Sequence, residues 1–174
     1  RAPSQTGRNR IDRLIPRVIQ AASDSAFPDR VLMRVLQLID TIQRRTTYIA
    51  LLLENPNALQ HLIRLASASS WIVSFLAQHP VLLDELIDPR TLYAPPEKTF
   101  LQEDLHRRLA KIQPEDLEYQ MEAMCIFKQV NTLRVAAADI TDVLPYLNAE
   151  LDGADYTPES KVLLWKSDRI RYAF

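Results

Sequence analysis

Carboxylates that could hold a metal ion or move a proton are scattered along this sequence rather than paired. No Asp-x-Asp occurs in the 174 residues. Asp116 and Glu118 are two residues apart and point apart on a helix, which makes them a poor metal clamp. Asp139 and Asp142 are three apart and could share a helix face, but without a glycine turn beside them they form only a weak metal pattern. The carboxylates therefore predict no metal centre.

The histidines and the single thiol form no catalytic set either. His61, His79 and His106 are far apart and lack metal-ligand spacing. His79 precedes Pro80, which favours a role in a turn. Cys125 lies in a predicted helix among apolar neighbours, which favours a buried structural thiol over a nucleophile. We therefore assign no catalytic, cofactor-binding or metal-binding residue in this chain.

The remaining charged clusters have structural interpretations. The densest basic cluster consists of Arg8, Arg10, Arg13 and Arg17. We interpret it as a solvated helix face, with a phosphate or an acidic partner as the alternative, because arginine makes bidentate contacts. Arg44–Arg45 and Arg107–Arg108 are expected to be surface pairs, with an internal salt bridge open to one member of each. Asp84 and Glu85 are expected to lie in solvent.

Large apolar residues follow helical spacing and are expected to form a core. Trp71 is interpreted as a core anchor rather than a ligand-stacking residue. The stripe Met121–Met124–Phe127 is likewise expected in the core rather than at a cofactor.

The bulk composition excludes several classes of protein. With 47% hydrophobic and 25% charged residues, the chain has the composition of a soluble globular domain. A formal net charge of -1 gives no whole-molecule attraction to nucleic acid or to an anionic membrane. One cysteine allows no internal disulfide and fits a cytoplasmic location. No apolar run approaches the roughly 20 residues of a membrane span. The chain does not begin with Met, so we expect a piece of a longer protein.

Glycine usage favours helices over strands. The chain has 2 glycines, where average usage would give about 12. Two glycines build no glycine-rich phosphate loop, and Walker, Rossmann and serine-hydrolase signatures are absent. The sequence therefore predicts an all-α fold, a multi-helix bundle-like domain of about seven to nine helices.

Prolines mark most of the predicted helix starts, because proline is favoured at the first helical position. These prolines are Pro28, Pro56, Pro80, Pro114 and Pro158. The predicted helices cover 29–53, 56–65, 67–77, 80–87, 99–112, 115–138, 141–151 and 158–173, with Pro145 inside or kinking the seventh. The clearest loop, 89–96, separates two helical subdomains, 1–95 and 96–174, of one continuous helical domain.

Four stretches taken in order, 8–22, 44–65, 69–93 and 116–140, resemble the glutamine synthetase adenylyltransferase/adenylyl-removing family. The most specific is the third, with Ser70-Trp71, His79-Pro80 and the run Leu82–Leu86. The fourth adds an Asp-x-Glu, a Phe-Lys at 127–128, a Leu-Arg at 133–134 and an aspartate at 139. Residues 147–174 depart from the stretch expected before the family's catalytic core.

The resemblance implies a fold and a context. Proteins of this family carry two nucleotidyltransferase halves joined by helical regions, and one half moves AMP from ATP onto a tyrosine of glutamine synthetase while the other removes it. This chain resembles the helical lead-in to the adenylylating half. The family's Gly-Gly or Gly-Ser turn followed by a magnesium-binding Asp-x-Asp matches no position here. ATP and magnesium are thus implied for the parent protein, and no cofactor for this chain.

The partners that the resemblance implies are the missing nucleotidyltransferase domain, glutamine synthetase and a PII-type signalling protein. Three hypotheses remain: a structural and regulatory helical part of an adenylyltransferase that is inactive alone, an unrelated helical interaction module, or a helical enzyme with an unrecognised site. An exposed apolar patch is expected where the missing domain docks. The Trp71–Phe75 helix and the Met121–Phe127 face are the two candidates.

Overall fold

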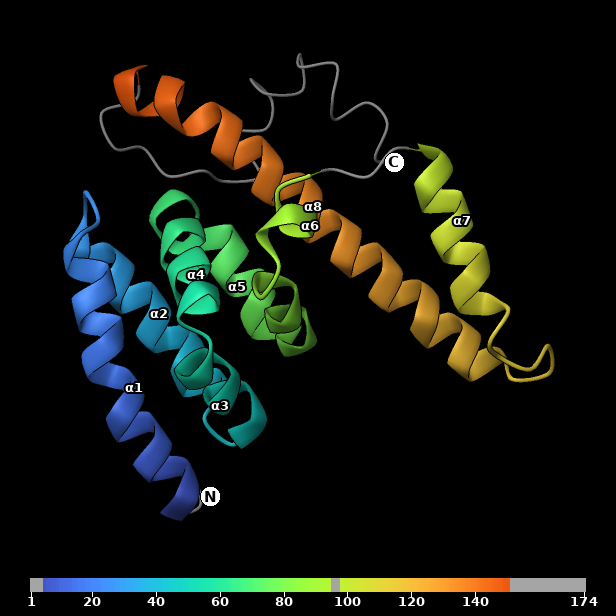
Figure 1. Cartoon of the computed structure of the whole chain (residues 1–174), viewed down its shortest axis with the longest axis horizontal. Coiled ribbons are helices and arrows are strands. Elements are labelled where there is room, and N and C mark those ends of the chain that lie inside the picture. Colours follow the sequence, from blue (N-terminus) through green and yellow to red (C-terminus); the bar gives the residue numbers. More distant parts are fainter. Residues whose placement is uncertain (1–4, 95–97, 151–174) are drawn as a thin grey trace.

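The computed structural model describes residues 5–94 and 98–150, with side chains described as far as residue 140. Within these residues the chain forms helices and no strand, which confirms the predicted all-α fold. The elements are α1 (Gln5–Ser23), α2 (Pro28–Ile42), α3 (Thr46–Glu54), α4 (Pro56–Ala68), α5 (Ser70–Gln78), the 3₁₀ helix η1 (Pro80–Leu86), α6 (Pro89–Leu92), α7 (Lys98–Leu109) and α8 (Leu117–Glu150) (Figure 1).

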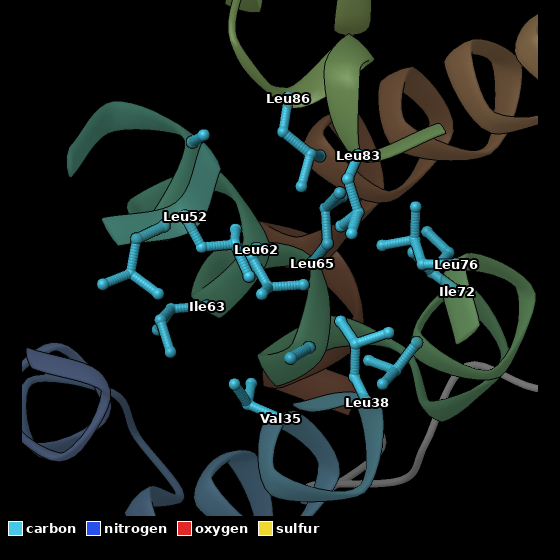
Figure 2. Close-up of a cluster of buried hydrophobic side chains, with 14 of the residues drawn as sticks. Val35, Leu38, Leu52, Leu62, Ile63, Leu65, Ile72, Leu76, Leu83 and Leu86 are labelled. Carbon is cyan, nitrogen blue, oxygen red and sulfur yellow. The ribbon is translucent and has the colours of Figure 1, made fainter. Parts of the chain in front are cut away.

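The core lies around α4, which packs against α1, α2, α3, α5, η1 and α8. Leu62 and Leu65 of α4 are fully buried and lie in the middle of the cluster, among side chains such as Leu38 and Leu83 (Figure 2). Burying one leucine of this kind contributes about 1.5–3 kcal/mol. These leucines therefore hold α1–α5 and η1 together as one body.

The predicted single helix over 29–53 is wrong, because the chain turns between Ile42 and Thr46. The backbone N–H of Arg45 donates to the Ile42 carbonyl at 2.8 Å and closes this turn. The turn brings α3 back against α1 and α4, so that Ile49 and Leu52 become fully buried. A straight helix would carry both side chains away from the core.

The prolines begin helices at most of the expected places. Pro28, Pro56 and Pro80 each occupy the first turn of a helix. Pro89 does the same for α6, in the segment predicted as a loop, where the Asp88 carboxylate caps the helix by accepting from the Arg90 N–H at 3.0 Å. Pro114 was expected to start a helix, but it lies in a turn and α8 begins at Leu117.

The C-terminal helix is longer than predicted. α8 continues from Leu117 to Glu150 without the break expected between 138 and 141. The helix predicted over 158–173 lies outside the described residues.

Candidate functional site

The two parts of α8 lie in different environments. Its second part packs into the core through Val130, Leu133, Ala137 and Ile140, all buried. Its first part pairs with α7 and projects from the body formed by α1–α5 (Figure 1). No residue of α7, all of which the structure describes, is buried. The α7–α8 hairpin (Lys98–Leu109 with the first part of α8) is therefore an appendage on a packed body.

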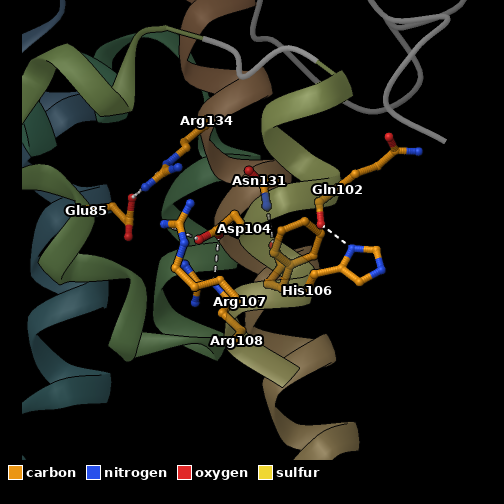
Figure 3. Close-up of polar contacts among 9 residues, drawn as sticks. Glu85, Gln102, Asp104, His106, Arg107, Arg108, Asn131 and Arg134 are labelled. Carbon is orange, nitrogen blue, oxygen red and sulfur yellow. Dashed lines mark hydrogen bonds and ion pairs between the residues drawn. The ribbon is translucent and has the colours of Figure 1, made fainter. Parts of the chain in front are cut away.

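An ion pair fixes α8 to the body at the root of this hairpin. Arg134 Nη2 lies 2.7 Å from Glu85 Oε2, and Arg134 Nε donates to the same oxygen at 2.9 Å (Figure 3). The two side chains are 14% and 19% exposed, so the pair is largely out of solvent. Glu85 was expected in solvent, and this prediction is wrong because Arg134 pairs with it in a largely buried place. The partner lies 49 residues away in the sequence, so local spacing did not indicate it.

Ion pairs within α7 and one cation–π contact from α7 to α8 hold the side chains of the hairpin. Asp104 accepts from Arg108 Nε at 2.8 Å and lies 3.6 Å from Arg107 Nη1 (Figure 3). The Arg108 guanidinium also lies 5.9 Å from the centre of the Phe127 ring, across the hairpin. A salt bridge was left open to one member of the Arg107–Arg108 pair, and both members pair with Asp104.

The turn between α7 and α8 is closed by one amide side chain. Gln120 Nε2 donates to the Gln113 carbonyl at 3.2 Å and to the Pro114 carbonyl at 3.1 Å.

His106 Nδ1 lies 2.7 Å from the Gln102 carbonyl on the outside of α7. His106 therefore makes a local backbone contact within α7.

The first part of α8 carries large apolar side chains that the described residues leave uncovered. We call Leu117, Met121 and Met124 the hairpin outer face; they are 67%, 62% and 42% exposed. Met121 and Met124 were expected in a core stripe with Phe127, and this prediction is wrong for both methionines. The Cys125 thiol is also exposed, which overturns its prediction as buried. Helical spacing correctly placed these residues on a helix but did not indicate which side α7 covers.

The other expected docking candidate is better covered. Trp71 and Phe75 are partly buried against the core and stack at 5.1 Å between ring centres. The Phe75 ring meets the His79 ring edge-on at 4.9 Å. His79 joins α5 to η1, which confirms its predicted place in a turn.

A polar cluster that the sequence did not indicate joins α4 to the end of α6. His61 Nδ1 lies 3.0 Å from Tyr93 Oη, and the Arg64 guanidinium lies 5.1 Å from the Tyr93 ring centre. Burial and, second, the charge of Arg64 lower the pKa of His61. Burial raises the pKa of Tyr93. Both shifts favour neutral side chains, so the cluster is a neutral hydrogen bond beside one cation.

Three of the four N-terminal arginines, Arg8, Arg13 and Arg17, are exposed as predicted, and Arg10 is partly buried. Arg10 Nη1 donates to the Thr46 carbonyl at 3.1 Å, and Arg17 Nη1 donates to the Leu53 carbonyl at 2.6 Å. Arg34, buried, donates in the same way to the Ala66 carbonyl at 2.6 Å. Leu53 and Ala66 lie in the last turns of α3 and α4, where carbonyls lack helical partners. Two arginines therefore cap helix ends.

The structure brings the candidate metal-binding side chains into no shared site within the part of the chain that it describes. It contains no group of three or more His, Cys, Asp or Glu side chains placed to hold a metal ion. Asp116 and Glu118 are exposed, and the Asp142 side chain of the weak Asp139–Asp142 pattern lies outside the described side chains. Nor is any helix there both long and apolar enough to cross a bilayer.

Comparison with known proteins gives a consistent result. The family model for glutamate-ammonia ligase adenylyltransferase matches residues 59–149. The chain is 44% identical over 170 residues, 98% of its length, to a bifunctional glutamine synthetase adenylyltransferase/adenylyl-removing enzyme of Pseudomonas putida. Proteins of the same name in Nitrosococcus oceani and Thioalkalivibrio sulfidiphilus are 44% and 45% identical over 96% and 84% of the chain. The chain spans 15–17% of the length of these relatives.

Proposed function

The chain belongs to the glutamate-ammonia ligase adenylyltransferase family, and from that premise we propose that it is a helical structural and regulatory segment of such an enzyme. The parent activity is transfer of AMP from ATP to a tyrosine of glutamine synthetase, with removal of AMP by a second activity, in the control of nitrogen assimilation. The segment itself performs neither reaction.

The observation that carries this proposal is the extent of the similarity. About 44% identity covers 96–98% of this chain, yet the chain accounts for only 16–17% of two relatives. The similarity therefore supports the role of one part of such an enzyme. The arrangement of the described helices, a packed body with a projecting hairpin, suits a part that supports other domains.

The parent reaction implies ATP and magnesium, and the side chains described here do not fit a site for them. Magnesium is held by carboxylate oxygens together with the nucleotide phosphates. The described carboxylates form no group that could hold a metal, and Asp104 and Glu85 are engaged by arginines. We assign no step of the transfer to this segment.

Glutamine synthetase is the proposed protein substrate, because the names of the relatives state it. A PII-type signalling protein is the proposed regulatory partner, on the basis of the family resemblance. Contacts with either partner would be made by the exposed surface of the segment.

An assay of AMP transfer tests the proposal. Purified glutamine synthetase is incubated with labelled ATP and magnesium, together with either residues 1–174 or the full polypeptide that contains them. We expect label on a glutamine synthetase tyrosine with the full polypeptide and none with the segment. Transfer by the segment alone, or none by the full polypeptide, contradicts the proposal.

A second candidate is a non-catalytic helical interaction module unrelated to nucleotide transfer. The exposed hairpin outer face favours this alternative, since uncovered apolar side chains mark interaction sites. In that case the full polypeptide would capture a protein partner and transfer no AMP.

A further inference from the structure

α8 carries two apolar stripes on opposite sides of the helix, one in its first part and the other further along, where the helix meets the body. The hairpin outer face has the spacing i, i+4, i+7 along α8. A second stripe with the same spacing, Ile126, Val130 and Leu133, packs on the body. Each residue of the second stripe follows one of the first by nine positions. At about 100° per residue, nine positions place two side chains on opposite sides of a helix.

Only one of these two stripes is covered within the described residues. Val130 and Leu133 are 5% and 0% exposed, whereas Leu117 and Met121 are 67% and 62% exposed. An apolar stripe left exposed on a helix that a second stripe already anchors to a body marks an interaction surface. The solvent side of this helix is marked separately by Glu118 and Glu122, both exposed. The outer face therefore lies on a different side of α8 from these two glutamates.

The length of the relatives indicates what covers the outer face. The family match over 59–149 includes all of α7 and all of α8 except its last residue, Glu150. In relatives that align with 96–98% of this chain, the hairpin belongs to a polypeptide about six times longer, since the chain is 16–17% of each. A domain of the same polypeptide is present at an effective concentration on the order of millimolar, well above that of a second copy. A covalently linked domain is therefore the favoured occupant.

We propose that the hairpin outer face, Leu117, Met121 and Met124, is the docking surface for the nucleotidyltransferase part of the same polypeptide. The identity of that occupant rests on the proposed function. The contact is apolar and is made by three side chains within two helical turns, in the manner of a helix laid against a groove. α8 then connects the helical body directly to the catalytic part.

Thiol accessibility in the full polypeptide tests the proposal. All variants carry Cys125→Ser, which removes the exposed native thiol of this segment. Met121→Cys places a thiol on the outer face, and Glu122→Cys, one residue away on the solvent side, is the matched control. Alkylation by N-ethylmaleimide is followed by mass spectrometry of the peptide that carries each site. We expect the Met121→Cys thiol to react at least tenfold more slowly than the Glu122→Cys thiol, with the difference lost in urea.

Equal reaction rates in the native protein would overturn the proposal. Protection that disappears on dilution to a monomer would also overturn it, because the occupant would then be a second copy. Met121→p-benzoylphenylalanine supplies the second readout by photo-cross-linking. A cross-link to a peptide of the nucleotidyltransferase part is expected, and one confined to the helical segment or formed between copies contradicts the proposal.

These outcomes are separable from the AMP transfer assay. An active full polypeptide with an unprotected Met121→Cys thiol contradicts this inference alone. A protected thiol in a polypeptide that transfers no AMP contradicts the proposed function and leaves the docking of a second body in place.

Discussion

Arg134 of α8 and Glu85 of η1 form an ion pair of 2.7 Å that lies where the long helix meets the body. Arg134 also donates through Nε to the same carboxylate oxygen, so the pair has directional hydrogen bonds as well as charge attraction. It lies within the covered part of α8, between the buried Leu133 and Ala137.

Arg134→Ala should destabilise the chain measurably. It leaves the largely buried Glu85 carboxylate without this partner, which costs about 1.5–3 kcal/mol for a hydrogen bond to a charged group. Urea unfolding of residues 1–174 measures the effect. Arg107→Ala is the control, because that side chain is 59% exposed and 3.6 Å from Asp104, and a change within about 0.5 kcal/mol is expected. Equal effects of the two substitutions contradict the assignment.

Arg34→Met should loosen the end of α4. The buried guanidinium donates to the Ala66 carbonyl at 2.6 Å, and methionine retains the apolar stem without any donor. A loss of about 1–3 kcal/mol in the free energy of unfolding is expected, as for a buried acceptor left without its donor. The exposed Arg44→Met provides the comparison and should be nearly neutral. A neutral Arg34→Met would show that this cap contributes nothing.

Leu62→Ala and Met121→Ala should differ in their effect on the free energy of unfolding, because one side chain lies in the core and the other on the hairpin outer face. Leu62 is fully buried at the centre of the body, and its truncation should cost about 2–5 kcal/mol. Met121 is 62% exposed, so its truncation should change stability by less than about 0.5 kcal/mol in residues 1–174. Thermal and urea unfolding provide both values. A large loss for Met121→Ala would mean that the isolated segment already covers this face.

His61 should make the stability depend on pH in a defined direction. Because its pKa is lowered in the fold, the folded protein favours the neutral imidazole, and the resulting stability is fully present above the unfolded pKa of about 6.5. This contribution should be lost as the pH falls from about 6.5 through the lowered folded pKa. The difference in unfolding free energy between the native chain and His61→Gln should therefore decrease on acidification. The exposed His106→Gln is the control, and an NMR titration placing the His61 pKa above 6.5 contradicts the account.

The fold was largely predictable because its signals are local. The spacing of apolar residues and the preference of proline for the first helical turn can both be read from neighbouring residues. Pro28 and Pro56 begin helices as expected. The turn after Ile42 was not predictable in this way. Apolar residues continue at helical spacing through it, and only the packing of α3 against α1 and α4 selects the bend.

The errors at candidate functional residues have a common cause, which is that burial depends on distant parts of the chain. Glu85 was expected in solvent and is held by Arg134, 49 positions away. Met121 and Cys125 were expected in a core and are exposed, because no described element packs on their side of α8. The His61–Tyr93 contact spans 32 positions and has no motif that a sequence could reveal.

The central claim is that nucleotide chemistry takes place outside this segment. Isothermal titration of residues 1–174 and of the full polypeptide with ATP and magnesium tests it most directly. Saturable binding by the full polypeptide and no saturable binding by the segment are predicted. Tight binding of ATP and magnesium by residues 1–174 alone would contradict the claim and would favour a helical enzyme with its own site.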